Sequence, residues 1–355
     1  MDLRIHNTRQ DMQSFGIERL GGLRIAQGTD GGDAAATNPD IGFGDAVWRS
    51  GDPALYQQIK YFRHSEGVRR RSRLGNRKLK DYFRRMTHAM LLEDRSIIAV
   101  TGAEARTFLQ GLITNDIEKV AHGRAIYAAL LTPQGKILFD FLITEGDAAI
   151  LIDCHRDARD TLIRRLSMYK LRAKIQIEAR EQLAVLAGLD GPAAHRGITF
   201  EDPRLPALGH RIIGARAEMP EMIPGAQIYT VHRVSLGVPE ARDFGSDRMF
   251  ALDADLDELQ AVDFNKGCYV GQELTARMKH RGTARKRLLL IESEAVLPPS
   301  GDLRAGGHSV GEIVSTYGAR GFALVRLDRL EEAGDTVVEA EGVRVAVTKQ
   351  PWLSA

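Results

Sequence analysis

The chain has 355 residues, of which 43% are hydrophobic, and its 49 Lys and Arg nearly balance its 47 Asp and Glu. This length is enough to bury a substantial core and favours more than one structural unit. The two cysteines, Cys154 and Cys268, exclude a disulfide framework and a protein-only iron–sulfur site with four thiolates. The sequence shows neither an apolar run of the roughly 20 residues that cross a bilayer nor an apolar secretory signal. We therefore expect a cytosolic (cytoplasmic) protein with no membrane partner.

Residues 1–89 differ in composition from the rest of the chain. They contain 16 Lys and Arg against 10 Asp and Glu, whereas residues 90–355 contain 33 and 37. Glycine-rich polar stretches precede a basic block over residues 63–85, and such composition buries too little apolar surface to fold. We expect a disordered extension, with the folded protein beginning near Met86 or Met90. A nucleic-acid-binding arm and a transit peptide are the alternatives for the basic block, and the aspartates between residues 30 and 45 argue against the transit peptide. A nucleic-acid partner is expected only through this block.

The pattern of residues 91–180 predicts alternating strands and helices. Thr101 and Glu104 form a capping-box pattern in front of an amphipathic helix, and a second helix is predicted around residues 162–166. Residues 132–135 suit a type I turn between two strands. This hairpin-rich order predicts an α+β fold rather than a doubly wound parallel sheet. The predicted strands are residues 96–101, 125–131, 137–144, 148–153 and 173–177.

Beyond Arg287 the pattern changes to short apolar segments with glycines between them. Such spacing favours a small antiparallel barrel or sandwich. The predicted strands are residues 288–291, 311–315, 321–325 and 343–347.

The most informative stretch is residues 265–277, Asn-Lys-Gly-Cys-Tyr-Val-Gly-Gln-Glu-Leu-Thr-Ala-Arg. The composition from Gln272 onward favours a helix, so Cys268 is expected near a helix N-terminus. That dipole and the neighbouring Lys266 would each lower the pKa of the thiol and favour the reactive thiolate. The alternative is a small apolar residue buried at a domain seam, and the flanking residues favour the functional thiol. The residues singled out are Lys266, Gly267, Cys268, Tyr269, Gly271, Gln272, Glu273 and Arg277.

Residues 266–273, Lys-Gly-Cys-Tyr-Val-Gly-Gln-Glu, resemble the signature of the YgfZ family, the folate-binding relatives of the glycine-cleavage T-protein, an aminomethyltransferase. Other segments resemble that family in the same order, so the resemblance extends from about Leu91 to the C-terminus. These segments are residues 108–116 (Phe-Leu-Gln-Gly-Leu-Ile-Thr-Asn-Asp), 131–136 (Leu-Thr-Pro-Gln-Gly-Lys), 169–174 (Tyr-Lys-Leu-Arg-Ala-Lys), 273–277 and 285–287.

The resemblance implies interlocked α+β domains around a central folate cavity over residues 90–285, followed by a β-barrel over residues 286–355. The family includes mitochondrial factors that help to mature [4Fe–4S] proteins. The resemblance therefore implies a folate-binding accessory protein for the assembly or repair of [4Fe–4S] enzymes, and an assembly factor rather than a turnover enzyme. The implied cofactor is tetrahydrofolate, without a stably bound metal. The implied partners are the iron–sulfur assembly machinery and its client enzymes.

Six polar side chains are the implied folate contacts. Asp140 interrupts an apolar strand, where a carboxylate is costly unless it is paired, solvated or faces a cavity. Arg233, expected in a short strand before Gly237, would pair with the folate glutamyl carboxylate. Each residue also has an ordinary explanation, as a turn former, an exposed strand residue, a surface arginine or a cover of the sheet. The six are Asn115, Asp116, Asp140, Tyr169, Arg172 and Arg233.

Departures from the T-protein pattern bear on the chemistry. The T-protein has two consecutive aspartates where this chain has Phe139-Asp140, and normally an acidic residue where it has Cys268. These changes favour thiol or cluster chemistry, and they leave folate-dependent one-carbon transfer with a carboxylate base as the alternative function. Asp255 also stands where the family usually has an asparagine.

Overall fold

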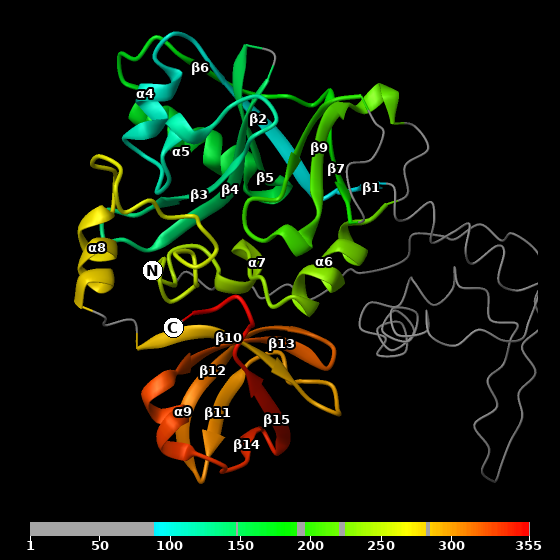
Figure 1. Ribbon diagram of the computed structural model, residues 1–355, viewed down its shortest axis with the longest axis vertical. Helices are drawn as coiled ribbons and strands as arrows, with labels where there is room; N and C mark the ends of the chain where they lie inside the picture. Colours follow the sequence, from blue (N-terminus) through cyan, green and yellow to red (C-terminus); the bar gives the residue numbers. More distant parts are fainter. Residues whose placement is uncertain (1–88, 147, 190–195, 220–223, 282–284, 355) are drawn as a thin grey trace, which may run out of the picture.

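The computed structural model describes residues 89–146, 148–189, 196–219, 224–281 and 285–354. Two antiparallel sheets form the upper part of the molecule in Figure 1 and a closed barrel the lower part, with helices α6 (Ala226–Ser235) and α7 (Ala241–Phe244) between them. The α+β fold and the C-terminal barrel predicted from the sequence are therefore confirmed. The expected extension lies outside the described residues, apart from its last residue, and so does its basic block. No helix within the described ranges is long and apolar enough to cross a membrane.

The larger sheet has the strand order β3-β4-β5-β2-β6. Helices α4 (Ala105–Gln110) and α5 (Arg159–Lys170) cover one face, where their Leu109 and Leu162 are fully buried in an apolar cluster with the sheet. The opposite face contributes to the main core, so both faces of the central strands are buried. The strands are β2 (Arg95–Thr101), β3 (Ile126–Leu131), β4 (Ile137–Gly146), β5 (Ala149–His155) and β6 (Gln176–Ala179).

The smaller sheet has the order β1-β7-β9-β8 and packs against the larger one through the main core. Its strands are β1 (Met90–Leu91), β7 (Leu183–Gly188), β8 (Ile198–Glu201) and β9 (His210–Ala215). Short 3₁₀ turns, η2 (Ile117–Lys119), η3 (Arg156–Ala158), η4 (Pro206–Leu208) and η5 (Arg216–Glu218), connect the elements.

The barrel closes in the order β10-β13-β12-β11-β14-β15, with helix α9 (Leu327–Ala333) after β13. Alternation along β10 explains how it joins the body. Leu288 and Leu290 belong to the main core, whereas Leu289 and Ile291 belong to the barrel's own core. The strands are β10 (Lys286–Glu292), β11 (Gly301–Ala305), β12 (His308–Tyr317), β13 (Arg320–Arg326), β14 (Val338–Ala340) and β15 (Val343–Thr348).

Three local predictions were wrong. The capping box before α4 is not formed; the Glu104 carboxylate instead accepts a hydrogen bond from the Lys174 amide at 3.3 Å. The strand expected over residues 173–177 begins only at Gln176. Arg233 lies in helix α6 rather than in a strand. The buried residues Tyr229 and Arg233 of this helix are four positions apart, so they share one helix face.

Candidate functional site

Cys268 lies on the loop that connects the core residue Val262 to helix α8 (Gln272–Arg281). Its side chain is exposed, four positions before the first residue of α8, as the composition of that stretch predicts. The next residue, Tyr269, is buried in the main core. The loop therefore exposes the cysteine, and the buried Tyr269 anchors the loop to the main core.

Lys266 anchors this loop to the turn that follows α4. Its ammonium nitrogen Nζ donates to the carbonyl oxygens of Gln110, Ile113 and Asn115 at 2.8, 2.7 and 2.8 Å. Burial lowers the pKa of Lys266 to about 8, so the ammonium is still protonated at neutral pH. All three donors of the ammonium are engaged. The ammonium therefore positions the loop, and its expected effect on the Cys268 thiol stays a prediction.

Asn115 and Asp116 also hold backbone. The Asn115 side-chain amide donates to the carbonyls of Tyr127 and Gln260, both at 2.8 Å. Asp116 caps η2 and accepts a hydrogen bond from the Gln110 amide at 2.8 Å. These residues support the same turn that Lys266 reaches, so the structure brings them to the cysteine loop and not to Asp140 or Arg233.

Gly271 fits the loop against the turn at residues 132–135. Its φ is +84°, and a Cβ there would lie 2.5 Å from the Thr132 carbonyl oxygen and 2.8 Å from Leu131 Cβ. Gly135, at φ +83°, faces the Gly271 carbonyl from the other side. Only glycine satisfies both the left-handed backbone and the close approach. Three sequence segments that share the family resemblance therefore meet around Cys268.

The remaining motif residues begin helix α8. The Gln272 side-chain oxygen accepts a hydrogen bond from the Tyr269 amide at 3.4 Å, and Glu273 pairs with Arg277 at 2.6 Å on the exposed face. Gly267 is exposed, and a Cβ at this position would meet no atom within 4 Å. Within this motif, Gly271 is thus required by the packing and Gly267 is not.

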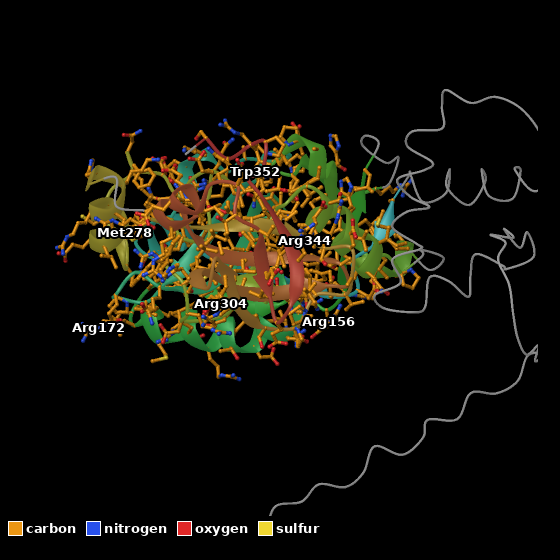
Figure 2. All side chains as sticks on the ribbon, turned by 90° about the horizontal axis from the view of Figure 1, so that it is seen from below. Arg156, Arg172, Met278, Arg304, Arg344 and Trp352 are labelled. Atoms are coloured by element: carbon orange, nitrogen blue, oxygen red, sulfur yellow. The ribbon has the colours of Figure 1, made fainter. Side chains whose placement is uncertain are left out.

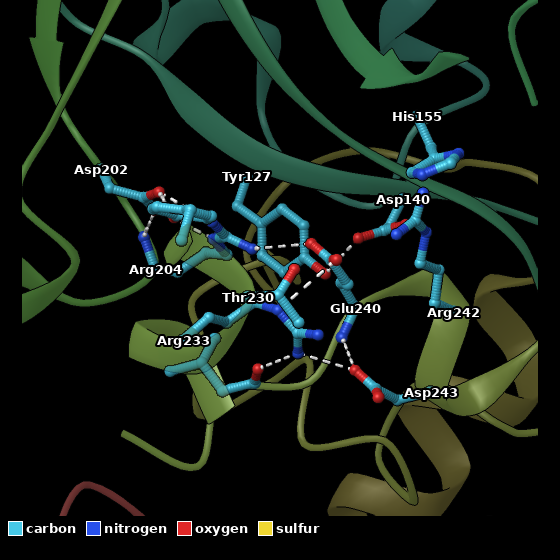
Figure 3. A network of polar contacts seen from close by, with 12 residues as sticks. Tyr127, Asp140, His155, Asp202, Arg204, Thr230, Arg233, Glu240, Arg242 and Asp243 are labelled. Atoms are coloured by element: carbon cyan, nitrogen blue, oxygen red, sulfur yellow. Dashed lines mark hydrogen bonds and ion pairs between the residues drawn. The ribbon is translucent and has the colours of Figure 1, made fainter. Parts of the chain in front are cut away.

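A second concentration of polar side chains is buried where the two sheets meet helices α6 and α7 (Figure 3). The Tyr127 hydroxyl donates to Asp140 Oδ2 at 2.9 Å, and Arg204 lies 5.5 Å from the centroid of the Tyr127 ring. Arg204 also binds Asp202 at 2.7 Å. The members of this buried network are Arg95, Tyr127, Asp140, Asp153, Asp202, Arg204, Arg211, Tyr229, Arg233, Glu240 and Asp243.

The charges of the buried network nearly cancel. Burial raises the pKa of the Asp140 carboxyl, and the nearby Glu240 raises it further. Burial also acts to raise the pKa of Glu240, but Arg233 and Arg95 outweigh it and hold that pKa below its usual value. Apart from Asp140, whose raised pKa disfavours the charged form, the network has four carboxylates and four guanidinium groups. Buried charges of this kind are tolerated when they are paired.

Arg233 is fully buried inside this network. Its side chain has 0% exposure. It donates to Asp243 at 2.7 Å, to the Val238 carbonyl at 2.6 Å and to the Tyr317 hydroxyl at 3.2 Å. It therefore has no accessible face for the carboxylate of a ligand. Its exposed-surface alternative is equally ruled out.

Tyr169 and Arg172 lie on the other side of the larger sheet. Tyr169 packs against the apolar cluster under α4 and α5, whereas the partner of Asp140, Tyr127, belongs to the main core. Arg172 is exposed just beyond the end of α5 and projects from the edge of the molecule in Figure 2. The two residues do not share a site with Asp140.

The six implied folate contacts thus occupy three separate places, and they do not fit one folate site. A surface groove of about 660 Å³ on the barrel, near Arg304 and Glu339, contains none of them. Within the described ranges, no group of three or more His, Cys, Asp or Glu residues is arranged to hold a metal ion. The absence of a resident metal stays a prediction.

Sequence reasoning missed most of the buried network. A usable signal was present, because Asp153 interrupts an apolar strand, as Asp140 does, and Arg211 lies at the start of another. A charged residue in such a strand needs a buried partner. The identity of that partner could not be read from the local sequence, since Asp153 pairs with Arg95 and Arg211, each 58 residues away.

Comparison with known proteins gives a consistent family. The CAF17 C-terminal β-barrel domain matches residues 285–355, and the GCVT N-terminal domain matches residues 86–199. The human mitochondrial iron–sulfur cluster assembly factor IBA57 is 32% identical, with 72% of this chain and 82% of that protein covered. The mitochondrial IBA57 homologue of Coccidioides immitis, also named an iron–sulfur cluster assembly factor, is 31% identical over 68% of this chain and 72% of its own length.

Among solved structures, the glycine cleavage system aminomethyltransferase T from Bartonella henselae has a TM-score of 0.61 at 18% identity, covering 78% of this chain and 89% of that one. This neighbour confirms the T-protein-like fold expected from the sequence. The narrower YgfZ resemblance stays a prediction, because the matching models and relatives are of the GCVT, CAF17 and IBA57 types.

The relatives also correct one prediction. They are named mitochondrial proteins, so the prediction of a cytosolic protein is wrong. That prediction rested on the two cysteines and on the absence of both a membrane-spanning apolar run and an apolar secretory signal. Such a signal marks the secretory route, whereas mitochondrial transit peptides are amphipathic and rich in arginine.

Proposed function

Because this chain belongs to the family of the IBA57 iron–sulfur cluster assembly factors, we propose that it acts in the assembly or repair of iron–sulfur clusters through the thiol of Cys268. The observation that carries the proposal is an exposed cysteine on a loop that is fixed on both sides, by Lys266 and by Gly271. A thiolate is the form of cysteine that binds iron. The cluster is the cargo in this proposal and is not a resident cofactor.

One thiol provides one ligand, whereas a [4Fe–4S] cluster takes four. The other cysteine is no source of a second ligand. Cys154 is buried, its Sγ donates to the Ser96 carbonyl at 3.7 Å, and burial raises the pKa of its thiol to about 12. The remaining ligands therefore have to come from a partner that delivers or receives the cluster. This is the reason to propose the assembly machinery and its client enzymes as partners.

The test is complementation of cells that lack the gene, with the activity of a [4Fe–4S] dehydratase as the measurement. We expect the activity to fall in the deletion and to return with the wild-type chain and with Cys154→Ser, which keeps a hydrogen-bond donor towards Ser96. Cys268→Ser should fail, because serine is nearly isosteric but a far poorer iron ligand. Full activity in the deletion would contradict the role in cluster assembly. Full rescue by Cys268→Ser would contradict the role of the thiol.

Tetrahydrofolate is not part of this proposal, because the implied contact residues do not converge on one site. Titration calorimetry of the full chain with reduced folates measures that interaction independently. The one-carbon-transfer alternative also lacks a supporting contact. Asp140 is buried and hydrogen-bonded to Tyr127, and the neighbouring Phe139 points into the apolar cluster on the opposite face of the sheet.

A further inference from the structure

The turn after helix α5 carries exposed apolar side chains. Leu171 is 89% exposed and Met168 is 68% exposed, the two highest values among the large hydrophobic residues with exposed side chains in the described part of the chain. Leu171 also has a φ of +45° with ψ −107°, outside the favoured regions for a residue with a Cβ. Such strain persists only where surrounding structure imposes it, and it concentrates at functional surfaces. Here β6 and the bond from the Ala173 amide to the Lys170 carbonyl, at 2.8 Å, fix the turn.

The same turn is strongly basic. No acidic residue occurs between residues 161 and 177, although residues 90–355 as a whole carry more acids than bases. Arg164 has one side-chain hydrogen bond, to Thr161, and none of the five basic residues forms an ion pair within the described residues. Three acids flank the surface: Glu104 faces the Lys174 amide, Glu178 pairs with Arg180, and Asp160 pairs with Arg159 one helical turn before Arg164. We call this surface the α5 turn patch, and its members are Arg164, Arg165, Met168, Lys170, Leu171, Arg172 and Lys174.

Helix α4 connects the patch to the cysteine loop. At its N-terminal side, the backbone of Lys174 lies so close to Gly102 that a Cβ on the glycine would be 2.2 Å from the Lys174 carbonyl oxygen. At its C-terminal side, the Gly111 carbonyl accepts a hydrogen bond from the Val270 amide at 3.3 Å. The helix has six residues, a length of about 9 Å at 1.5 Å per residue.

Two further observations place both surfaces on one side of the molecule. Tyr169 and Val270 pack against the same apolar cluster under α4 and α5. Figure 2 shows Arg172 towards the same side as Met278 of helix α8, which follows the cysteine loop. One partner with a standard interface of about 800 Å² would cover both the patch and Cys268.

We propose that the α5 turn patch is the docking surface for an acidic protein, whose apolar depression accepts Leu171 while its carboxylates meet the surrounding cations. This rests on the proposed function, since the docked protein is the one that exchanges a cluster at Cys268. The projecting leucine favours a protein over a nucleic acid, because phosphates and stacked bases give an aliphatic side chain little apolar area to bury. Only two large apolar side chains project, which is a small area for insertion into a membrane.

The first experiment identifies the partner in cells. A photo-crosslinking phenylalanine derivative replaces Leu171 in the full chain, and the same derivative at Val296, which is 64% exposed on the barrel side of the chain, is the matched control. We expect a product at position 171, absent at 296, that contains a protein with a net negative charge. That protein is then purified, and its affinity for the chain is measured at low and at high salt.

The second experiment measures what the patch contributes. Leu171→Gly removes the apolar side chain and relieves the left-handed backbone, so it should fold at least as stably as the wild type. The triple variant Arg164→Glu, Arg172→Glu, Lys174→Glu reverses the charge. We expect each variant to weaken binding of the purified partner on the order of tenfold. In the triple variant the association rate should fall, and added salt should no longer slow association as it does for the wild type. The control triple variant on the barrel, Arg304→Glu, Arg344→Glu, Lys349→Glu, should bind as the wild type does.

Several outcomes would overturn the proposal. They are unchanged affinity and full complementation by both patch variants, no protein crosslinked at position 171, or a crosslinked protein that is not acidic. The proposal would also be overturned if no protein partner is found and the chain instead binds phosphatidylglycerol vesicles or a 20-nucleotide RNA, with that binding lost in the patch variants. Failure of the proposed function is distinguishable. In that case the deletion leaves the [4Fe–4S] enzymes active, while the crosslinking and affinity measurements still decide whether the patch docks a protein.

Discussion

At the scale of single residues, Asp255 combines an unusual backbone conformation with a buried carboxyl group. It is fully buried at a φ of +59°, and its Oδ2 has no hydrogen-bond partner among the described residues. Arg287 is 3.5 Å from the other carboxyl oxygen. Burial nonetheless raises the pKa of Asp255 well above its usual value, against the lowering by Arg287. The ionised carboxylate is therefore disfavoured in the folded state.

We expect Asp255→Asn to stabilise the protein at neutral pH by about 1 kcal/mol, since asparagine is uncharged and tolerates a positive φ. The direction with pH follows from linkage. The pKa of this carboxyl is about 3.9 in the unfolded state and higher in the folded state. The free energy of unfolding therefore falls as the pH rises from the unfolded pKa towards the folded pKa. The advantage of the variant should therefore shrink as the pH is lowered towards 4. Urea unfolding at pH 4 and pH 7 measures this difference.

Asp257→Asn is the matched control, because Asp257 is paired with Arg287 at 2.8 Å and with Lys279 at 3.3 Å. That variant should lose stability. Equal effects of the two substitutions on stability would mean that the folded state does not disfavour the ionised carboxylate of Asp255.

At the scale of elements, the position of Cys268 depends on how its loop packs on the turn between β3 and β4. The ladder of these strands brings the turn at residues 132–135 to Gly271, which directly precedes helix α8. The Lys266 ammonium fixes the other side of the loop to the end of α4. Two separate elements thus define where the thiol stands.

We expect Gly271→Ala to displace the loop and to cost at least about 2 kcal/mol, because it combines a left-handed φ with contacts to backbone that cannot yield. Cys268 should then lose its function in complementation, and its alkylation rate by iodoacetamide should change. Gly267→Ala, in the same loop and one residue from the cysteine, has open space and should behave like the wild type. A wild-type alkylation rate and full rescue by Gly271→Ala would show that the thiol does not need this packing.

At the scale of the whole molecule, one carboxylate connects the body to the barrel. Asp243 of α7 binds Arg233 of α6 through one oxygen and accepts hydrogen bonds from Ser315 and Tyr317 of β12 through the other, both at 2.7 Å. The main core also includes barrel residues, Leu288 and Leu290 among them. The barrel is therefore packed as part of one structure.

Asp243→Asn should cost about 3–5 kcal/mol, because it removes the closer of the two carboxylates that neutralise the buried Arg233 guanidinium. For a chain of this size, each kcal/mol lowers Tm by roughly 2–4 °C, so differential scanning calorimetry would detect the change easily. Asp328→Asn removes an exposed pair with Arg326 and should leave Tm almost unchanged. A Tm for Asp243→Asn close to that of Asp328→Asn would mean that the seam contributes little to stability.

The local pattern of the sequence determined much of the architecture. Short apolar segments predicted the strands β2 to β5, and short glycine-separated segments predicted four strands of the barrel. The turn at residues 132–135 and the helix after Gln272 were also predictable, because glycine, proline and helix-forming residues act over only a few positions. The smaller sheet was not predicted. Its strand β1 has only two residues, too few to show a period.

The resemblance of a few ordered motifs was enough to predict the T-protein-like fold and a role connected with iron–sulfur proteins. It did not say what each polar residue does. Asn115, Asp116 and Lys266 were expected to serve a ligand or a thiol, and in the structure they bind backbone carbonyls or cap short turns.

Only the tertiary structure decided the partners of the charged residues. Arg233 reads as a surface arginine or a ligand contact, and its neutralisation by Asp243 and Glu240 follows from the way α6 packs against α7 and the barrel. The physical reason is that the energy of a buried charge depends on groups within a few ångströms. Those groups come from distant parts of the chain. Hydrophobic periodicity is a property of neighbouring residues and can be read in one dimension, whereas charge pairing and the exposure of Cys268 and Leu171 are properties of the folded surface.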